Sequence, residues 1–184
     1  MMSRRIVNFL PGEREATMPK LRVHNFSISL DGYAAGPDQG SENPLGVGGT
    51  RLHEWVFATE SARRMHSMEG GASGIDDTFV ARGTEGIGAT IMGRNMFGPI
   101  RGPWGDDPWS GWWGDEPPFH HPVFVLTHHP HAAITMQGGT TFRFVDDGID
   151  AALERAFDAG RRRRRHARRR SVDHPAVPQR RPDR

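Results

Sequence analysis

The chain has 184 residues, 35% of them hydrophobic, and a formal net charge of +2, and this length suits one domain. It contains no cysteine, which excludes a disulfide framework, a thiolate nucleophile and a cysteine-ligated metal, and fits a reducing compartment such as the cytoplasm. No run of 18 apolar residues occurs in the sequence, so we expect no membrane association through a spanning helix.

The charge is divided between two regions of the chain. Residues 161–184 hold 11 arginines and 2 acidic residues, whereas residues 1–160 hold 13 basic and 20 acidic residues. The body of the protein is therefore acidic, and the basic character belongs to the C-terminal segment.

The first 50 residues predict one strand and one long loop. Residues 1–18 show no apolar period, and we expect a disordered extension. Residues 21–30 alternate loosely and end in an apolar run, which predicts a buried strand. Asp31-Gly32 is typical of a turn, and the glycine-rich stretch that follows predicts either a mobile lid beside a ligand site or an ordinary surface loop.

Two short helices are expected next. Thr59 or Ser61 is predicted to cap the first, which would end before Gly70-Gly71. Ser73 is predicted to cap the second, over residues 73–82, with the inward-facing side chains Ile75, Phe79 and Val80.

Residues 89–97 (Ala-Thr-Ile-Met-Gly-Arg-Asn-Met-Phe) predict a buried strand that ends at a turn before a short helix. At such a junction Gly93 lets an anion approach the backbone closely, and Arg94 adds a planar guanidinium suited to phosphate. One interpretation is therefore a cradle for a nucleotide phosphate. The other is that Gly-Arg serves turn geometry only.

Residues 98–118 form a Gly- and Pro-rich segment that contains Trp104, Trp109, Trp112 and Trp113. Tryptophan side chains bury large areas, so free disorder is not expected here. The segment is either an aromatic flap over a flat substrate or a subunit interface, or it packs against the surface of its own domain.

The last predicted elements are two strands and a helix. Residues 123–126 and 141–145 predict strands, and residues 149–159 predict a helix that Asp147 would cap. Its inward-facing residues would be Ile149, Leu153, Ala156 and Phe157. This order of elements predicts an α/β domain with a largely parallel sheet.

Three of these motifs resemble motifs of the dihydrofolate reductase-like superfamily, and they occur along the chain in the same order as in that family. Residues 91–94 are similar to its phosphate-binding Met-Gly-Arg junction, and residues 123–127 to its next strand. Residues 29–36 (Ser-Leu-Asp-Gly-Tyr-Ala-Ala-Gly) are similar to the first strand and mobile loop of its bacterial branch. That branch contains the reductase domain of the bifunctional riboflavin-biosynthesis deaminase-reductase. The resemblance covers about residues 20–160 and implies a mostly parallel central sheet flanked by helices.

The activity implied by the resemblance is NADPH-dependent hydride transfer to a small heterocyclic or carbonyl substrate. The residues implied to bind the cofactor follow two strands: Gly93, Arg94 and Asn95 after the first, and Leu126, Thr127 and His128 after the second. Asp31 would lie near the nicotinamide, and Glu54 is the nearest candidate acid for protonating the substrate. Met96 stands where folate-reducing relatives often have a hydroxyl residue, which favours a pyrimidine or another substrate over dihydrofolate.

Five histidines, at positions 120, 121, 128, 129 and 131, raise the question of a metal site. They form no i, i+4 pair on a predicted helix, and no acidic ligand accompanies them. We therefore expect no bound metal.

The C-terminal segment departs from the family pattern. Where the family continues with a strand, a Gly-Gly-Gly turn that contacts the cofactor and further strands, this chain continues with arginines. Residues 19–160 would then form a partial domain lacking its C-terminal strands, and residues 161–184 a disordered tail. The single lysine beside 23 arginines indicates GC-rich coding, so we interpret the tail as a possible frameshift product.

Two alternatives to an active reductase remain open at this level. The first is a truncated, inactive relative whose basic tail binds nucleic acid and other polyanions without sequence selection. The second is a homodimer subunit that uses the Trp-rich segment as its interface.

Overall fold

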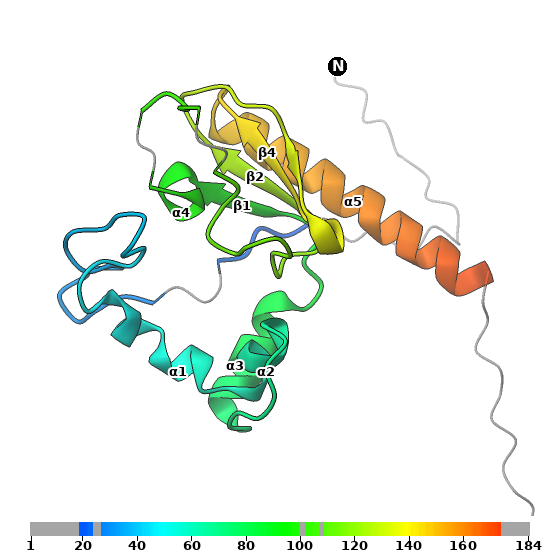
Figure 1. Cartoon of the computed structure of the whole chain (residues 1–184). Coiled ribbons are helices and arrows are strands. Elements are labelled where there is room, and N and C mark those ends of the chain that lie inside the picture. The colour runs from blue at the N-terminus through cyan, green and yellow to red at the C-terminus, as the bar shows by residue number, and fades with distance from the viewer. Residues whose placement is uncertain (1–18, 24–26, 100–101, 107–108, 174–184) are drawn as a thin grey trace, which may run out of the picture.

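The structure, a computed structural model, describes residues 19–23, 27–99, 102–106 and 109–173, with side chains in the last helix as far as Arg164. Its centre is a four-stranded sheet in the order β1-β2-β4-β3, formed by β1 (Thr90–Gly93), β2 (Pro122–Leu126), β4 (Thr141–Val145) and β3 (Ile134–Thr135). The first three strands are parallel, and β3 is antiparallel to β4. The expected α/β architecture with a mostly parallel sheet flanked by helices is confirmed (Figure 1).

The sheet is buried on both faces, as expected of parallel strands with continuous apolar runs. On one face Phe124 and Val145 pack against Ala152 and Ala156 of α5 (Ile149–Asp173). The other face carries the second core cluster: Met92, Phe97, Val123, Val125 and Phe142.

The Trp-rich segment covers this second face. Trp104, Trp109 and Trp113 pack against the cluster around Phe142, together with α4 (Arg94–Phe97), which contributes the fully buried Phe97. These three tryptophans therefore pack on their own domain, which was the second of the two interpretations of this segment. The segment takes the place that a helix commonly occupies in an α/β fold.

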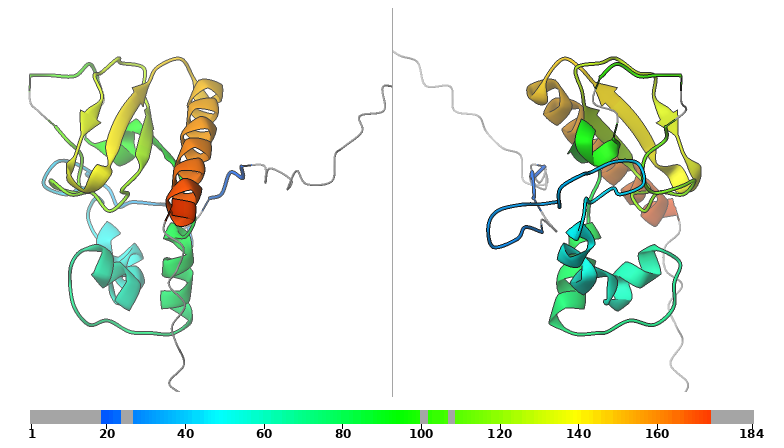
Figure 2. Two further views of the ribbon diagram at one scale, coloured as in Figure 1. Left: turned by 90° about the vertical axis from the view of Figure 1, so that its right-hand side faces the viewer. Right: turned by 60° about the vertical axis from the view of Figure 1, so that its left-hand side comes forward.

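A small helical region lies below the sheet in Figures 1 and 2. It comprises the 3-10 turn η1 (Gly49–Leu52), α1 (Glu54–Phe57), α2 (Glu60–Met65) and α3 (Ile75–Thr84). Thr59 caps α2 as predicted, because its hydroxyl oxygen accepts a hydrogen bond from the backbone N–H of Ala62 at 3.2 Å. The 3-10 turn η2 (Gln137–Gly139) lies between β3 and β4.

The orientation of α3 differs from the prediction. The helix begins at Ile75 after Gly74, so Ser73 is not its cap, and Ile75 and Phe79 are exposed. The reason is a hydrogen bond at 2.6 Å from the backbone N–H of Ser61 to the carboxylate of Asp77. This bond turns the face with Asp77 and the buried Val80 toward α2. Positions two residues from Asp77 then lie on the opposite side.

The strand predicted over residues 21–30 is not formed by its described residues, 21–23 and 27–30. Leu21, Val23 and Leu30 are exposed there. A strand is stable only when a neighbour pairs with it, and loose alternation does not supply one. Arg22 instead donates hydrogen bonds to the carbonyl oxygens of Gly83 and Glu85, at the end of α3.

The last helix is longer than predicted. It continues past Ala159 through Gly160 and the arginines to Asp173, so residues 161–173 are helical and not a disordered tail. Residues 174–184 and the extension over 1–18 lie outside the described residues. Asp147, the expected cap, accepts two hydrogen bonds from Arg155 instead. No helix in the described part of the chain has both the length and the apolar character needed to cross a bilayer.

Within the helix, Gly160 lies opposite another glycine, Gly88. A Cβ atom added to Gly88, just before β1, would lie 2.7 Å from the Cα of Gly160, which is closer than real contacts allow. A Cβ atom added to Gly160 would lie 3.9 Å from the Cα of Gly88, an ordinary contact. The two backbones therefore approach closely only because Gly88 has no side chain.

We therefore expect opposite effects from the same substitution at these two positions. Gly88→Ala should destabilise the fold by about 1–3 kcal/mol, because backbone atoms must separate. Gly160→Ala should stabilise it by up to about 1 kcal/mol, because alanine is the better helix former. Urea unfolding of both variants measures the difference, and an equal destabilisation would contradict the close approach of α5 to residue 88.

Candidate functional site

The two segments predicted to hold the cofactor phosphates meet at one edge of the sheet. β1 and β2 are parallel neighbours, and their last residues, Gly93 and Leu126, are in register. The loops after the two strands therefore leave the sheet side by side, at the edge where ligands bind in open parallel sheets. Here Arg94 Nη1 donates a hydrogen bond to Thr127 Oγ1 at 2.9 Å.

Arg94 is held on three sides by its own chain. Besides Thr127, its Nη2 donates to the carbonyl oxygen of Gly102 at 3.0 Å, and its Cζ lies 3.3 Å from the ring centre of Trp104. Burial lowers the pKa of the guanidinium, although an arginine remains charged at neutral pH. Its third nitrogen, Nε, is buried and has no hydrogen-bond partner among the described atoms.

Trp104 forms a cover over this edge of the sheet. Its indole Nε1 donates to the carbonyl oxygen of His129 at 3.0 Å. The centre of its ring lies 4.6 Å from the ring centre of His131 and 5.0 Å from that of Phe144. The cover therefore joins the loop after β1 to the loop after β2. The sequence identified Trp104 as one of four tryptophans but did not predict its contact with Arg94, because that contact depends on the path of the loop.

The glycine at position 93 is not required by the structure of the chain itself. Its φ of −78° is open to any residue, and an added Cβ atom would meet no described atom within 4 Å. Neither backbone strain nor packing explains a glycine here. The open space above its backbone permits close approach by a ligand.

The other predicted cofactor residues lie around this point in different environments. Asn95 and His128 are exposed, whereas Thr127 is buried. The side chain of Leu126 packs against the core cluster on the α5 side, where it anchors the end of β2. Because α4 has only four residues, its dipole is small, and Arg94 is the main positive charge of the edge.

Comparison of the sequence with protein-family models and with curated proteins gave no match. The functional interpretation therefore depends on the geometry of these residues.

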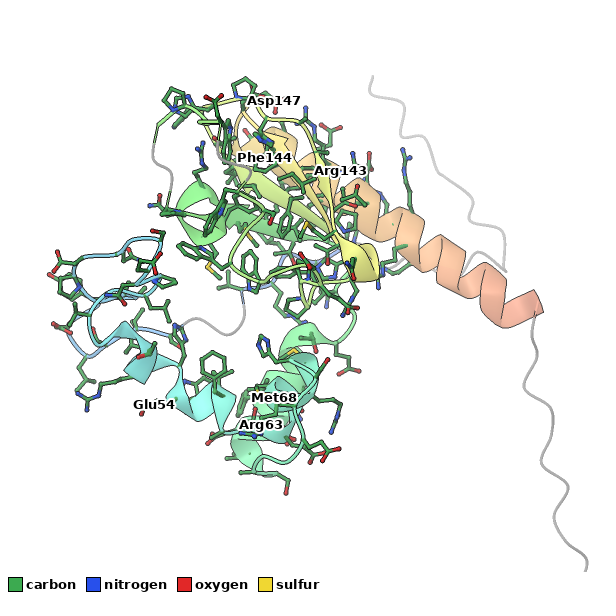
Figure 3. All side chains as sticks on the ribbon, in the orientation of Figure 1. Glu54, Arg63, Met68, Arg143, Phe144 and Asp147 are labelled. Atoms are coloured by element: carbon green, nitrogen blue, oxygen red, sulfur yellow. The ribbon has the colours of Figure 1, made fainter. Side chains whose placement is uncertain are left out.

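The predicted catalytic carboxylates share a second location. Asp31 and Glu54 both line an open cavity of about 1120 Å³ together with Tyr33 and Arg51. Asp31 accepts a hydrogen bond from the hydroxyl of Ser29 at 2.5 Å. Figure 3 labels Glu54 at the start of α1.

The loop that forms much of this cavity folds back on itself. The N–H groups of Gly36 and Val47 donate to the carbonyl oxygens of Leu45 and Pro37, both at 2.8 Å. The loop lies below α4 in all three views of Figures 1 and 2. No residue that lines the cavity belongs to β1, β2 or the loops after them. The structure thus brings the two carboxylates to one cavity but does not join that cavity to the Arg94 edge.

The histidines have separate roles in the described structure. His121 is buried, and its Nε2 lies 2.8 Å from Thr90 Oγ1, while His120 Nδ1 lies 2.9 Å from the carbonyl oxygen of Gly138. His131 packs against Trp104, with the two rings tilted by 59°. Among the described residues, no three His, Asp or Glu side chains gather closely enough to hold a metal.

Proposed function

We propose that the protein is an NADPH-dependent reductase of the dihydrofolate reductase-like type, similar to the riboflavin-pathway reductase domain. Its substrate would be a small heterocyclic or carbonyl compound. The observation that carries the proposal is that Gly93, Arg94 and Thr127 lie together at the carboxyl ends of two parallel strands. There the side chain of Arg94 donates a hydrogen bond of 2.9 Å to that of Thr127. The absence of cysteine supports the cytoplasm as the place of action.

The residues at this edge fit a phosphate group. A buried N–H donor without an acceptor costs about 1–3 kcal/mol, and a phosphate oxygen at Nε of Arg94 would recover that cost. The open backbone at Gly93 leaves room for the same group to approach. Thr127, already fixed by Arg94, would hold the guanidinium in orientation while it binds.

When bound, NADPH supplies the hydride. Asp31 and Glu54, which line one cavity, are the candidates for moving a proton to the substrate carbonyl or imine. Because the hydride and the proton go to the same substrate, the nicotinamide end of the cofactor would have to extend from the Arg94 edge to this cavity.

A titration with NADPH, followed by tryptophan fluorescence, tests the proposal. We expect saturable quenching, because a phosphate at Nε of Arg94 would lie close to the indole of Trp104, whose ring centre is 3.3 Å from Cζ of this arginine. Arg94→Met should weaken binding by about 10–100-fold, the value of one hydrogen bond to a charged group.

The matched control is Arg82→Met, which removes an exposed arginine on α3 and should leave the affinity unchanged. Trp104→Phe shows whether the quenching comes from this tryptophan. In this variant calorimetry should still detect the binding of NADPH, whereas the quenching of tryptophan fluorescence should be reduced. No saturable binding of NADPH by the folded wild-type protein would overturn the proposal.

A further inference from the structure

A basic groove lies beside α5, on the side of the sheet away from β1. Its volume is about 930 Å³, and its lining includes four arginines: Arg143 from β4, and Arg155, Arg162 and Arg163 from α5. Asp158 is the one acidic residue among the lining side chains that the structure describes. Figure 3 shows Arg143 on β4 beside α5.

The groove exists because α5 covers only part of its face of the sheet. The helix packs mainly on β1 and β2, and on this face of β4 it covers Val145 but leaves Arg143 exposed. Val145 points to the α5-side core, and Arg143, two residues earlier on the same strand, lies on the same face. The strand therefore contributes a cation to a surface that otherwise belongs to the helix.

The arginines that α5 contributes to the groove are spaced along the axis of the helix. Arg155 and Arg162 are seven residues apart, which places them on the same face and about 10 Å apart along the axis. The sequence of α5 holds nine arginines in 25 residues, and the helix extends beyond the sheet in Figures 1 and 2. The positive charge of Arg155, Arg162 and Arg163 thus extends along the helix as a track that is longer than a single phosphate group requires.

Much of this charge is not neutralised within the protein. Arg155 is paired with Asp147, and Arg161 is paired with Asp158. Arg163 donates a hydrogen bond to the carbonyl oxygen of His120. Among the described side chains, Arg143 and Arg162 take part in no ion pair. Unpaired guanidinium groups on two facing elements are suited to phosphate oxygens, which they bind with two parallel donors.

We propose that this groove binds the phosphate backbone of nucleic acid without selecting its sequence. The linear track favours a polymer over a single anion. Of the rings in the lining, Phe124 and His121 are buried and His131 is tilted against Trp104, so the groove offers arginines to phosphates more readily than rings to bases. The site differs from the predicted tail, because it includes a strand residue and a folded helix, and it does not depend on the proposed reductase activity.

The test measures binding of a fluorescent 20-nucleotide oligothymidine by anisotropy, using the full chain at several salt concentrations. With four phosphate contacts, the logarithm of the affinity should fall with the logarithm of salt with a slope of about −3. Arg143→Gln should weaken binding about fivefold in 0.1 M salt and reduce that slope by about 0.7, one contact's share. Arg162→Gln should do the same.

Arg82→Gln, on α3 outside the groove, is the matched control and should bind as wild type does. Arg143 is exposed and forms no described hydrogen bond, so its replacement should leave the fold intact. Wild-type affinity in the Arg143 variant would overturn the proposal, because the arginine run alone would then account for binding. Displacement of the oligonucleotide by inorganic phosphate at an equal phosphate concentration would also overturn it, since the site would then be one for small anions.

Discussion

Replacing Phe142 by alanine is expected to destabilise the protein by about 3–5 kcal/mol, the cost typical of removing a buried aromatic side chain. Phe142, the second residue of β4, is fully buried. Its ring centre lies 5.0 Å from that of Phe97, 5.8 Å from that of Trp113 and 6.2 Å from that of Phe119. A domain of this size is typically stable by about 5–15 kcal/mol, so the loss is a large fraction of the total.

The size of this effect follows from what Phe142 joins. The strand, α4 and the Trp-rich segment meet at its ring, and apart from the four-residue α4 no described helix contributes to this cluster. A cavity at this point removes contacts from three segments at once, and they can close it only by moving together. Because Trp104 belongs to the same cover, Phe142→Ala should also loosen the contact between Trp104 and Arg94.

Urea unfolding followed by tryptophan fluorescence measures the loss. Phe79→Ala is the matched control, since Phe79 lies on the exposed side of α3, and its replacement should cost less than about 1 kcal/mol. Equal losses in the two variants would show that the aromatic cluster around Phe142 does not stabilise the fold.

The parts of the fold that the sequence predicted well are those where one local pattern decides the structure. The strands over residues 90–93, 122–126 and 141–145 are short apolar, β-branched or alternating runs bounded by turn residues. The order of strands and helices predicted a largely parallel sheet, and these three strands are parallel. Because the carboxyl ends of adjacent parallel strands meet at one edge, the fold brings Arg94 and Thr127 into contact.

The predictions that were wrong depended on partners distant in the sequence. The run over residues 21–30 has strand-like residues, but its described part pairs with no strand. The faces of α3 were misassigned because the hydrogen bond between Asp77 and Ser61 spans 16 residues. The end of α5 was misplaced because a change in composition at Gly160 was taken for a change in structure, although arginine is a good helix former.

The candidate site shows the same division. Residue type and position pointed to Gly93 and Arg94, and the family resemblance implied Thr127, whereas the contacts of Arg94 with Trp104 and with the carbonyl oxygen of Gly102 depend on the path of a loop. Arg143 was overlooked for a related reason. It is a single charge within a strand, and only the folded chain brings it beside the arginines of α5.

Protein stability is expected to fall as the pH falls from about 6.5 to about 4, because His121 resists protonation in the fold. Burial, and after it the positive charges of Arg163 and His120, lower the pKa of His121 from 6.5 to about 4. In the unfolded chain the ring takes up a proton near pH 6.5, whereas in the folded chain it stays neutral until about pH 4. The unfolded state therefore binds more protons throughout this window, and acid favours it.

The expected loss follows from the size of the shift and has an upper limit. A shift of this size corresponds to at most about 3 kcal/mol of unfolding free energy between pH 7 and pH 4, and to less where solvent reaches the ring. His121→Gln removes the titrating group but keeps an amide that can reach the hydroxyl of Thr90, now 2.8 Å from Nε2. In this variant the decrease in stability across the window should be smaller by about 2–3 kcal/mol.

Arg163→Gln provides the second variant, because it removes one cause of the lowered pKa and leaves the burial unchanged. The pKa of His121 should then rise toward its usual value, and the pH dependence should be intermediate between those of the wild type and the glutamine variant at 121. Urea unfolding at pH 4, 5, 6 and 7 gives all three curves. If His121→Gln kept the full decrease, other groups would have to account for it, and the buried ring would not be the origin of the acid sensitivity.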